Sequence, residues 1–198
     1  MNEQDFLKEA ASIFPYLQEM RRGFHHHPEL GDHEKWTSER IAQELTSMGI
    51  EVSRPVGTAV VGLLQGALPG RVAALRADMD ALPVEEKTGL PYSSKTPNVM
   101  HACGHDGHTA IQLIVAKILA NHRDEFKGAI KFIFQPNEEE AGALDMINEG
   151  ILQSPKVDGA CALHLWSPVK TGRIGLSSGP VLGTTEEFEL KILGKAGH

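Results

Sequence analysis

Four short runs of nearly continuous apolar residues are the feature that most constrains how this chain can fold. They cover residues 58–64, 71–79, 129–134 and 159–166. Apolar and polar side chains do not alternate along them, as they would on a strand with one face in water. The runs therefore predict strands that are covered on both faces, as in a largely parallel sheet.

Helical patterns precede and separate these runs. Apolar residues recur every three or four positions over 6–24, where Pro15 predicts a kink or a restart, and again over 34–48. Residues 109–122 predict a buried helix, and residues 138–150 predict a helix with a polar start. This alternation predicts a layered α/β fold whose central sheet is mixed, largely parallel and flanked by helices.

The composition argues against several classes of function. Acidic residues outnumber basic ones by 26 to 19, which gives a net charge of −7 and disfavours a nucleic-acid partner. The first ten residues do not resemble a secretory signal, and no stretch approaches the roughly 18 apolar residues of a membrane span. The two cysteines lie among other candidate functional residues, so we expect a cytoplasmic protein without a disulfide framework. Because no apolar span is present, we also expect no membrane partner.

Polar residues cluster at the ends of the predicted strands. Asp78 and Asp80 close one strand, residues 138–140 are all glutamate and follow another, and His164 lies late in a third. The histidine-rich stretch 101–108 leads into the buried helix. Ligand sites in open α/β sheets form beyond the carboxyl ends of the strands, so we expect these groups at one rim.

Cys103 and His105 are candidate metal ligands. They are two residues apart, so in an extended segment both side chains would face the same way. Thiolate and imidazole both bind zinc and related divalent metals, and Asp106 or His101 would support them through hydrogen bonds. The alternative is a small buried cysteine with histidines at the start of a helix.

The glutamates after the third run strengthen the metal interpretation. At a strand-to-helix turn two of the glutamates at 138–140 can converge on one ion, and a metal-dependent hydrolase needs one carboxylate to bind metal and another to accept a proton. The alternatives are a solvated helix start for the glutamates and a hydrogen-bonded core residue for His164. The shared placement of one cysteine, two histidines and paired glutamates is what a two-metal hydrolase requires.

Six segments of the chain also match a known pattern in order, from about residue 21 to the end: RRGFHHHPELG, LRADMDALPVEE, NVMHACGHDGHTA, FIFQPNEEEAGA, ALHLW and GKAGH. Together they resemble the metal-dependent aminoacylase/carboxypeptidase superfamily. The closer resemblance is to its amidohydrolase branch, which includes hippurate hydrolases, N-acyl-amino-acid amidohydrolases and auxin-conjugate hydrolases. It implies a catalytic domain with a dinuclear metal site over 1–183, and the first strand of an inserted α/β lid domain over 184–198.

The resemblance also implies roles for individual residues. The implied metal ligands are Cys103, His105, Glu139 and His164. Glu138 would be the general base, and Asp80 would support the site. His198 would be the lid histidine, which in relatives reaches a site, commonly that of the partner subunit, and helps hold the substrate carbonyl. The lid implies a homodimer for the full-length protein.

Two departures from the family pattern affect what we expect. Glu140 stands where relatives usually have glycine, so this turn is more acidic. The family's last metal ligand, a histidine, and most of the lid come downstream of the position of His198. We therefore expect a truncated chain, which would be inactive by itself.

The predicted function is cleavage of the amide bond of N-acyl amino acids or similar small conjugates by metal-activated water. Two divalent ions per subunit are expected, zinc or manganese first, with nickel or cobalt as alternatives. Two other functions stay open. One is an amidase in which Cys103 is the nucleophile and His101 or His105 is its base. The other is a metal-binding domain without catalysis.

Overall fold

The computed structural model describes residues 3–181, 183, 188–195 and 197, which fall into two units that divide after Leu165. The first unit holds all the helices and strands of the described residues. The expected strand through Phe188, Leu190 and Ile192 is not formed in residues 188–195, because a strand needs a neighbour to bond with its backbone. The lid domain over 184–198 stays a prediction.

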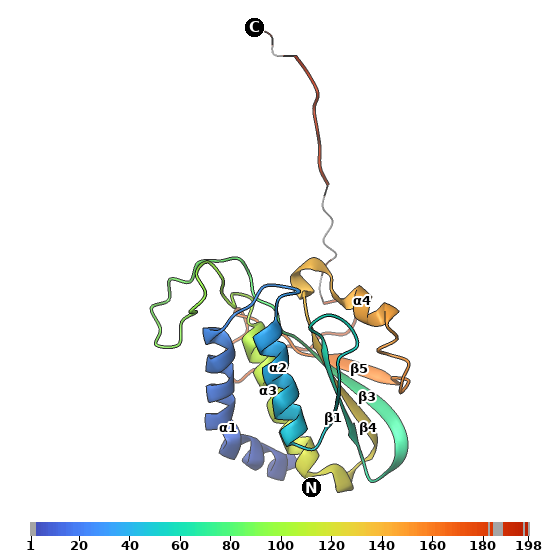
Figure 1. The fold of residues 1–198 in the computed structure, drawn as a ribbon. Helices are drawn as coiled ribbons and strands as arrows, with labels where there is room; N and C mark the ends of the chain where they lie inside the picture. Colours follow the sequence, from blue (N-terminus) through green and yellow to red (C-terminus); the bar gives the residue numbers. More distant parts are fainter. Residues whose placement is uncertain (1–2, 182, 184–187, 196, 198) are drawn as a thin grey trace. The chain divides into compact units, whose positions relative to one another are not determined.

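The first unit is built on a five-stranded sheet with the order β1-β2-β4-β3-β5 (Figure 1). The strands are β1 (Glu51–Ser53), β2 (Val60–Gln65), β3 (Leu68–Asp78), β4 (Lys127–Gln135) and β5 (Gly159–Ala162). β3 is parallel to both β4 and β5, whereas β2 is antiparallel to β1 and β4. The predicted mixed, largely parallel sheet is confirmed. β1 was not predicted, because three residues are too few to show a pattern.

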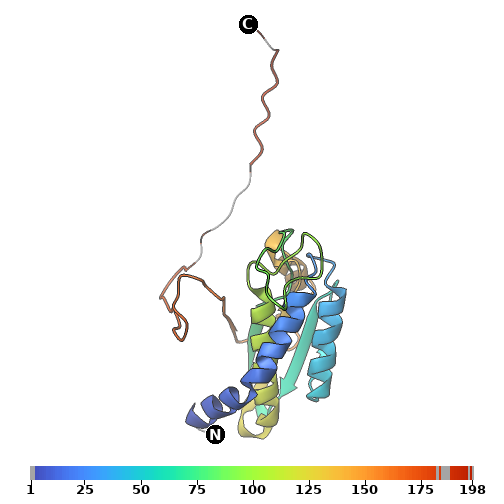
Figure 2. The same ribbon diagram turned by 90° about the vertical axis from the view of Figure 1, so that its left-hand side faces the viewer.

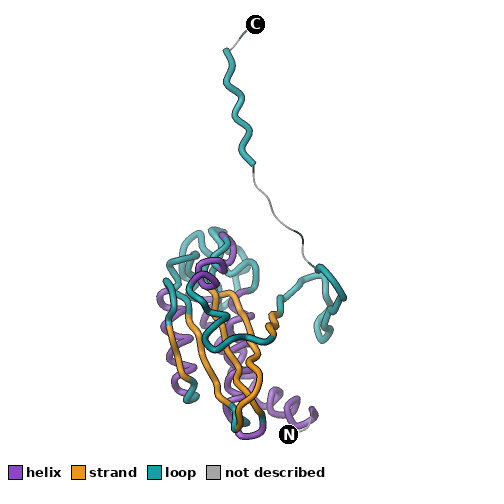
Figure 3. Tube along the Cα trace, turned by 90° about the vertical axis from the view of Figure 1, so that its right-hand side faces the viewer, coloured by secondary structure: helices purple, strands orange, loops and turns teal. Residues whose placement is uncertain are grey.

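Three long helices cover one face of this sheet, and a short one lies on the other (Figures 1 and 3). They are α1 (Glu3–His26), α2 (Lys35–Ser47), α3 (His105–Asn121) and α4 (Ala143–Asn148). α1 continues through Pro15 and is bent (Figure 2), so the predicted kink is found and the alternative of a restart is not. This layering confirms the predicted α/β class.

Two apolar clusters hold the layers together. The larger one joins the three long helices to the sheet, and its members include Phe24, Leu45, Leu113, Phe132 and Phe134, each at most 1% exposed. The smaller one joins α4 to the opposite face, and its members are Ala59, Val61, Ala74, Ile133 and Met146. Both faces of the central strands are thus buried, as their continuous apolar runs indicated. For the run 159–166 the prediction of a covered strand is wrong, because β5 ends at Ala162 and all four of its residues are exposed.

The start of α3 differs from the expectation. The helix begins at His105, four residues before the predicted start, and Gly104 before it takes a left-handed conformation with a φ of 93°. Cys103 and His105 therefore do not lie on one extended segment, and the reason given for their facing the same way is wrong. The left-handed glycine reverses the chain between them instead.

The predicted helix over 138–150 is also interrupted. Residues Glu138–Glu140 form a single 3₁₀ turn (η2), and a second such turn, η1 (Arg123–Glu125), follows α3. Ala141 is left-handed with a φ of 68°, a conformation that cannot continue a right-handed helix, so α4 starts only at Ala143. The glutamates therefore lie on a separate turn, which can point them in directions that a helix would not allow.

Residues 81–100 form a long irregular loop, fixed by isolated bridges from Ala81 to Leu30 and from Leu82 to Met100. Within the described part of the chain, every helix is too short or too polar to cross a membrane.

The core makes a direct prediction for stability. Phe132 is fully buried between the sheet and the long helices, so Phe132→Ala should lower the free energy of unfolding by about 3–5 kcal/mol. Phe14→Ala is the matched control, because this ring is 56% exposed and its loss should change stability by less than about 0.5 kcal/mol. Urea denaturation measures both. Equal effects of the two substitutions would contradict this account of the core.

Candidate metal centre

The parallel pairing of β3 and β4 creates the candidate site. Asp78, the last residue of β3, lies opposite Gln135, the last residue of β4, and the backbone N–H of Met79 donates to the carbonyl of Gln135 at 3.1 Å. Parallel strands end at the same edge of a sheet. The residues that follow each strand, Asp80 on one side and Glu138 on the other, are therefore brought to the same rim.

His105 lies at the centre of this rim and is fully buried. Its Nδ1 is 3.0 Å from both the carboxylate Oδ1 and the carbonyl oxygen of Asp80. Both of these atoms are acceptors, so Nδ1 donates and Nε2 carries the lone pair. Nε2 has no hydrogen-bond partner within the described residues.

The atoms around this nitrogen are carboxylate oxygens. His105 Nε2 is 3.7 Å from Asp78 and 3.8 Å from each of Glu138 and Glu139. Burial lowers the pKa of His105, but the hydrogen bond with Asp80 and the surrounding carboxylates outweigh burial, and the net pKa is raised. A buried, unpartnered nitrogen facing several carboxylates is suited to binding a cation, so the residues present fit a metal ion.

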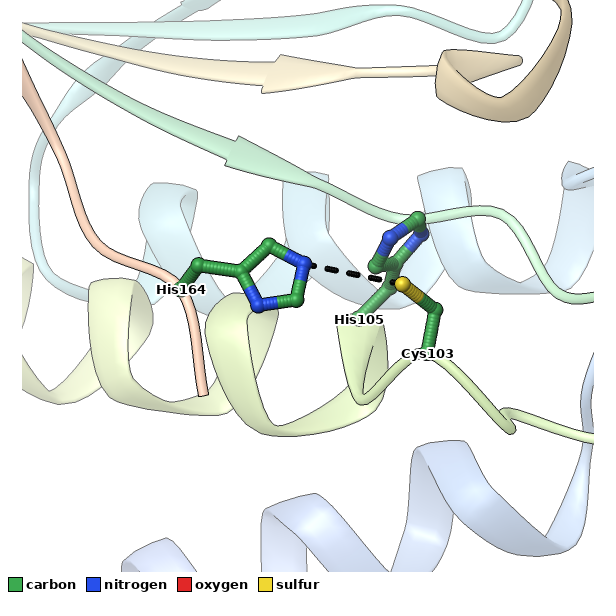
Figure 4. Close-up of side chains that lie close together, drawn as sticks. All are labelled: Cys103, His105 and His164. Atoms are coloured by element: carbon green, nitrogen blue, oxygen red, sulfur yellow. Dashed lines mark hydrogen bonds between the residues drawn. The ribbon is translucent and has the colours of Figure 1, made fainter. Parts of the chain in front are cut away.

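Two overlapping groups of donor atoms surround this position. The donor atoms of Cys103, His105 and His164 all lie within 4.8 Å of one another, and so do those of His105, Glu138 and Glu139. Figure 4 shows the Cys103 sulfur pointing toward the ring of His164, with Sγ 3.5 Å from Nε2. Because the groups share His105, the structure brings all four predicted metal ligands and the predicted base into one cluster.

A third group, Asp78 with His105 and His108, is held by hydrogen bonds that leave His108 no free nitrogen. His108 Nδ1 donates to Asp78 at 2.6 Å, and its Nε2 accepts from the backbone N–H of Leu165 at 2.8 Å. With both nitrogens in use, His108 is unsuited to bind metal. Its bond to Leu165 instead holds the segment that carries His164 against the start of α3.

The two aspartates with predicted supporting roles have different partners. Asp80 accepts from His105 and, through Oδ2, from the backbone N–H of Glu139 at 3.2 Å, so it contacts two predicted ligands. Asp106 accepts from His25 at 2.7 Å and from Arg21 at 2.8 Å, both on α1. It therefore ties the helix that carries His105 to α1.

One histidine of the 25–27 run is buried in this same connection. His25 is 3% exposed and lies between Asp106 and Glu86, the latter from the long 81–100 loop at 3.2 Å. Burial lowers the pKa of His101 to about 4, and neither of its ring nitrogens has a hydrogen-bond partner among the described residues, so its predicted support of the ligands is not seen.

The electrostatics of Cys103 bear on the alternative in which it is a nucleophile. Burial and the nearby carboxylates, Glu139 foremost, raise the pKa of the Cys103 thiol to about 12. A nucleophilic cysteine needs a lowered pKa and a positive environment. The structure therefore disfavours the nucleophile. The same excess of negative charge would favour a divalent cation beside the sulfur.

The predicted lid residue His198 lies outside the described residues, so its role stays a prediction.

The fold and this cluster define a metallopeptidase-type α/β domain. A family model described as peptidase family M20/M25/M40 matches residues 74–196, which is more than half of the chain. The chain belongs to this family, and the predicted superfamily is confirmed.

Individual relatives agree with this assignment. The chain is 46% identical over 181 residues to an N-acyl-L-amino acid amidohydrolase of Geobacillus stearothermophilus, covering 90% of this chain and 48% of the relative. It is 40% identical over 196 residues to a hippurate hydrolase of Campylobacter jejuni, covering 98% of this chain and 51% of the relative. The chain thus spans about half the length of these curated relatives.

A solved structure shows the same fold. The YXEP protein of Bacillus subtilis, a dinuclear metal-binding peptidase of the M20 family, superposes with a TM-score of 0.82 at 39% identity. The match covers 86% of this chain and 48% of that one.

The raised thiol pKa makes a prediction for cysteine reactivity. In metal-free protein at pH 8 only about one Cys103 thiol in ten thousand is ionised, so iodoacetamide should modify it more than about 100-fold more slowly than the exposed Cys161. Peptide mass spectrometry follows both sites in one sample, with Cys161 as the internal control. Faster modification of Cys103 than of Cys161 would show that its environment has been misread.

Proposed function

We propose that residues 1–183 carry the catalytic part of a metal-dependent amidohydrolase. Its substrates are N-acyl amino acids or similar small amide conjugates, and its products are a carboxylic acid and an amino acid or related amine. The observation that carries this proposal is the buried Nε2 of His105, which has no hydrogen-bond partner among the described residues and faces both Glu138 and Glu139. The substrates of the Geobacillus and Campylobacter relatives support the choice of substrate class.

The proposed cofactor is a pair of divalent ions. Cys103, His105, Glu139 and His164 are the residues of this chain that would hold them. Bound metal supplies two kinds of chemistry, a lowered pKa for water and polarisation of the substrate carbonyl. The mixture of sulfur, nitrogen and oxygen donors suits zinc or manganese, with nickel or cobalt as alternatives.

Glu138 is the proposed general base. Its side chain is 38% exposed, so water and substrate reach it, whereas His105 behind it is sealed from solvent. The guanidinium of Arg76 lies 4.0 Å from one oxygen of this carboxylate. Glu138 accepts a proton from the attacking water and then passes it to the leaving amine.

Asp80 contacts both the central histidine of the site and the turn that carries the two glutamates. Asp80 fixes the proton of His105 on Nδ1, which leaves Nε2 available as a ligand, and it also binds the backbone of Glu139. These contacts support the turn that carries both glutamates, each of which has a carboxylate oxygen 3.8 Å from His105 Nε2. Of the two, Glu139 is the proposed ligand and Glu138 the proposed base.

Three further parts of the proposal concern the whole protein. His198 belongs to a lid that helps hold the substrate carbonyl, and the enzyme is a homodimer through that lid. The protein acts in the cytoplasm. Neither nucleic acid nor membrane is a partner, in keeping with the net charge of −7.

Substitution of the base tests the mechanism. Glu138→Gln in the full-length protein should lower kcat by about 100- to 10,000-fold while metal content stays unchanged, because an amide can no longer accept the proton. Glu140→Gln is the matched control on the same turn, where the side chain is exposed. Hydrolysis of a panel of N-acyl amino acids and elemental analysis give the two readouts. Near-normal turnover by Glu138→Gln would remove this residue from the mechanism.

Metal removal tests the class of chemistry. A chelator should abolish hydrolysis of N-acyl amino acids, and added Zn²⁺ or Mn²⁺ should restore it, whereas modification of Cys161 should have no effect. Activity that persists in chelator and is lost on thiol alkylation would favour the cysteine nucleophile. Metal binding without hydrolysis of any such substrate would favour a non-catalytic metal domain.

A further inference from the structure

Residues 29–34, in the short segment between α1 and α2, contact Asn137, the residue before the turn η2 that carries the proposed base. Within this segment Glu34 is fully buried. One carboxylate oxygen accepts from the backbone N–H of Asn137 at 2.9 Å, and the other accepts from the hydroxyl of Thr58 at 2.6 Å. A buried carboxylate is costly to desolvate, and here both hydrogen-bonded partners are neutral donors.

Asn137 is the residue just before Glu138, and both its backbone and its side chain are in contact with neighbouring residues. Its backbone is left-handed, with φ 51° and ψ 44°. Asp32 accepts from its side-chain amide at 2.8 Å, and its own carbonyl accepts from the N–H of Gly142 at 2.7 Å. A Cβ on Gly31 would lie 2.1 Å from the side-chain oxygen of Asn137, so only glycine allows this approach.

The conformation of Asn137 decides where the glutamates point. A left-handed residue reverses the chain as it leaves β4, and it costs about 1–3 kcal/mol unless its surroundings impose it. After this reversal Glu138 and Glu139 both come within 3.8 Å of His105 Nε2. The contacts of residues 29–34 with Asn137 therefore act on the geometry of the glutamate pair.

A simpler role for Glu34 would be to cap α2, because it is the residue before the first turn of that helix. Its side chain makes no capping bond, however. The carboxylate of Glu29 does this instead, accepting from the backbone N–H groups of Trp36 at 3.1 Å and Thr37 at 2.9 Å. The side chain of Glu34 is thus available for Asn137.

We propose that Glu34, with Gly31 and Asp32, is a positioning element that fixes Asn137 and thereby sets the distances of Glu138 and Glu139 from His105. It rests on the proposed function and extends it to residues that touch neither substrate nor metal. The element should act on kcat and on metal affinity and should leave KM nearly unchanged.

The experiment compares two substitutions of Glu34 in the full-length protein. Glu34→Leu keeps a side chain of similar size but removes the acceptor, and it should lower both kcat and the affinity for Zn²⁺ by about 10- to 100-fold. Glu34→Gln keeps an oxygen for Asn137, while Thr58 accepts from the new amide, so it should stay within about threefold of the wild type. Steady-state kinetics with an N-acyl amino acid and zinc titration against a chelating dye give the readouts.

Two more variants keep the test decisive if Glu34→Leu fails to fold. Gly31→Ala introduces the clashing Cβ without touching Glu34 and should reproduce the losses in kcat and zinc affinity. Thr58→Val removes the other bond of Glu34 and should lose less than about threefold. The proposal is overturned if Gly31→Ala retains both properties, or if Thr58→Val loses as much as Gly31→Ala.

The two readouts also separate this inference from the proposed function. If the natural protein hydrolyses no N-acyl amino acid, the proposed function fails, but zinc affinity still shows whether Gly31→Ala disturbs the site. If the natural protein is active and the positioning variants are equally active and bind zinc equally well, the positioning element alone is refuted.

Discussion

The parallel register of β3 against β4 is the constraint on which the rest of the site depends. It places Asp78 opposite Gln135, so the chain leaves both strands at the same level and on the same edge of the sheet. Asp80 and Glu139 are 59 positions apart in sequence, yet the register brings the backbone of one to the carboxylate of the other. A shift of one residue would turn every side chain of β4 to the opposite face and would also move the glutamates away from His105.

The two aspartates at this edge have more hydrogen-bonding and ionic partners than the two glutamates. This difference leaves an excess of negative charge beside His105. Asp78 is bound by Arg76 and His108, so its pKa falls although burial opposes ionisation. Asp80 has His105 and a backbone N–H as donors. Among the residues that the structure describes, Glu138 and Glu139 have no comparable set of partners around His105 Nε2, and the thiol of Cys103 resists ionisation beside them. A divalent cation would resolve this local excess of negative charge.

The sequence predicted those features that depend on local pattern or on a family motif. Continuous apolar runs predicted the buried strands β2, β3 and β4 but not the exposure of β5. The polar residues after the runs predicted one rim with Cys103, His105 and the glutamates on it. Periodicity failed where a single residue leaves the right-handed conformation. Ala141 divides a predicted helix in two, and the left-handed Asn137 has no signal in the apolar pattern. Asparagine tolerates the left-handed conformation, and at Asn137 it is also supported by tertiary contacts with Glu34 and Asp32, which are distant in sequence.

A left-handed residue reverses the chain next to each of the two groups of proposed site residues. On a regular helix or strand, the side chains of adjacent residues diverge, so Glu138 and Glu139 could not both face a single centre through regular structure alone. Gly104 reverses the chain between Cys103 and His105, and Asn137 reverses it before Glu138. The reversal at Asn137 is contacted from outside the turn by residues 29–34, and the helix that follows Gly104 is bound to α1 through Asp106. The N-terminal helices therefore do more than cover the sheet, because the segment joining them and the end of α1 hold the turns that aim the proposed ligands.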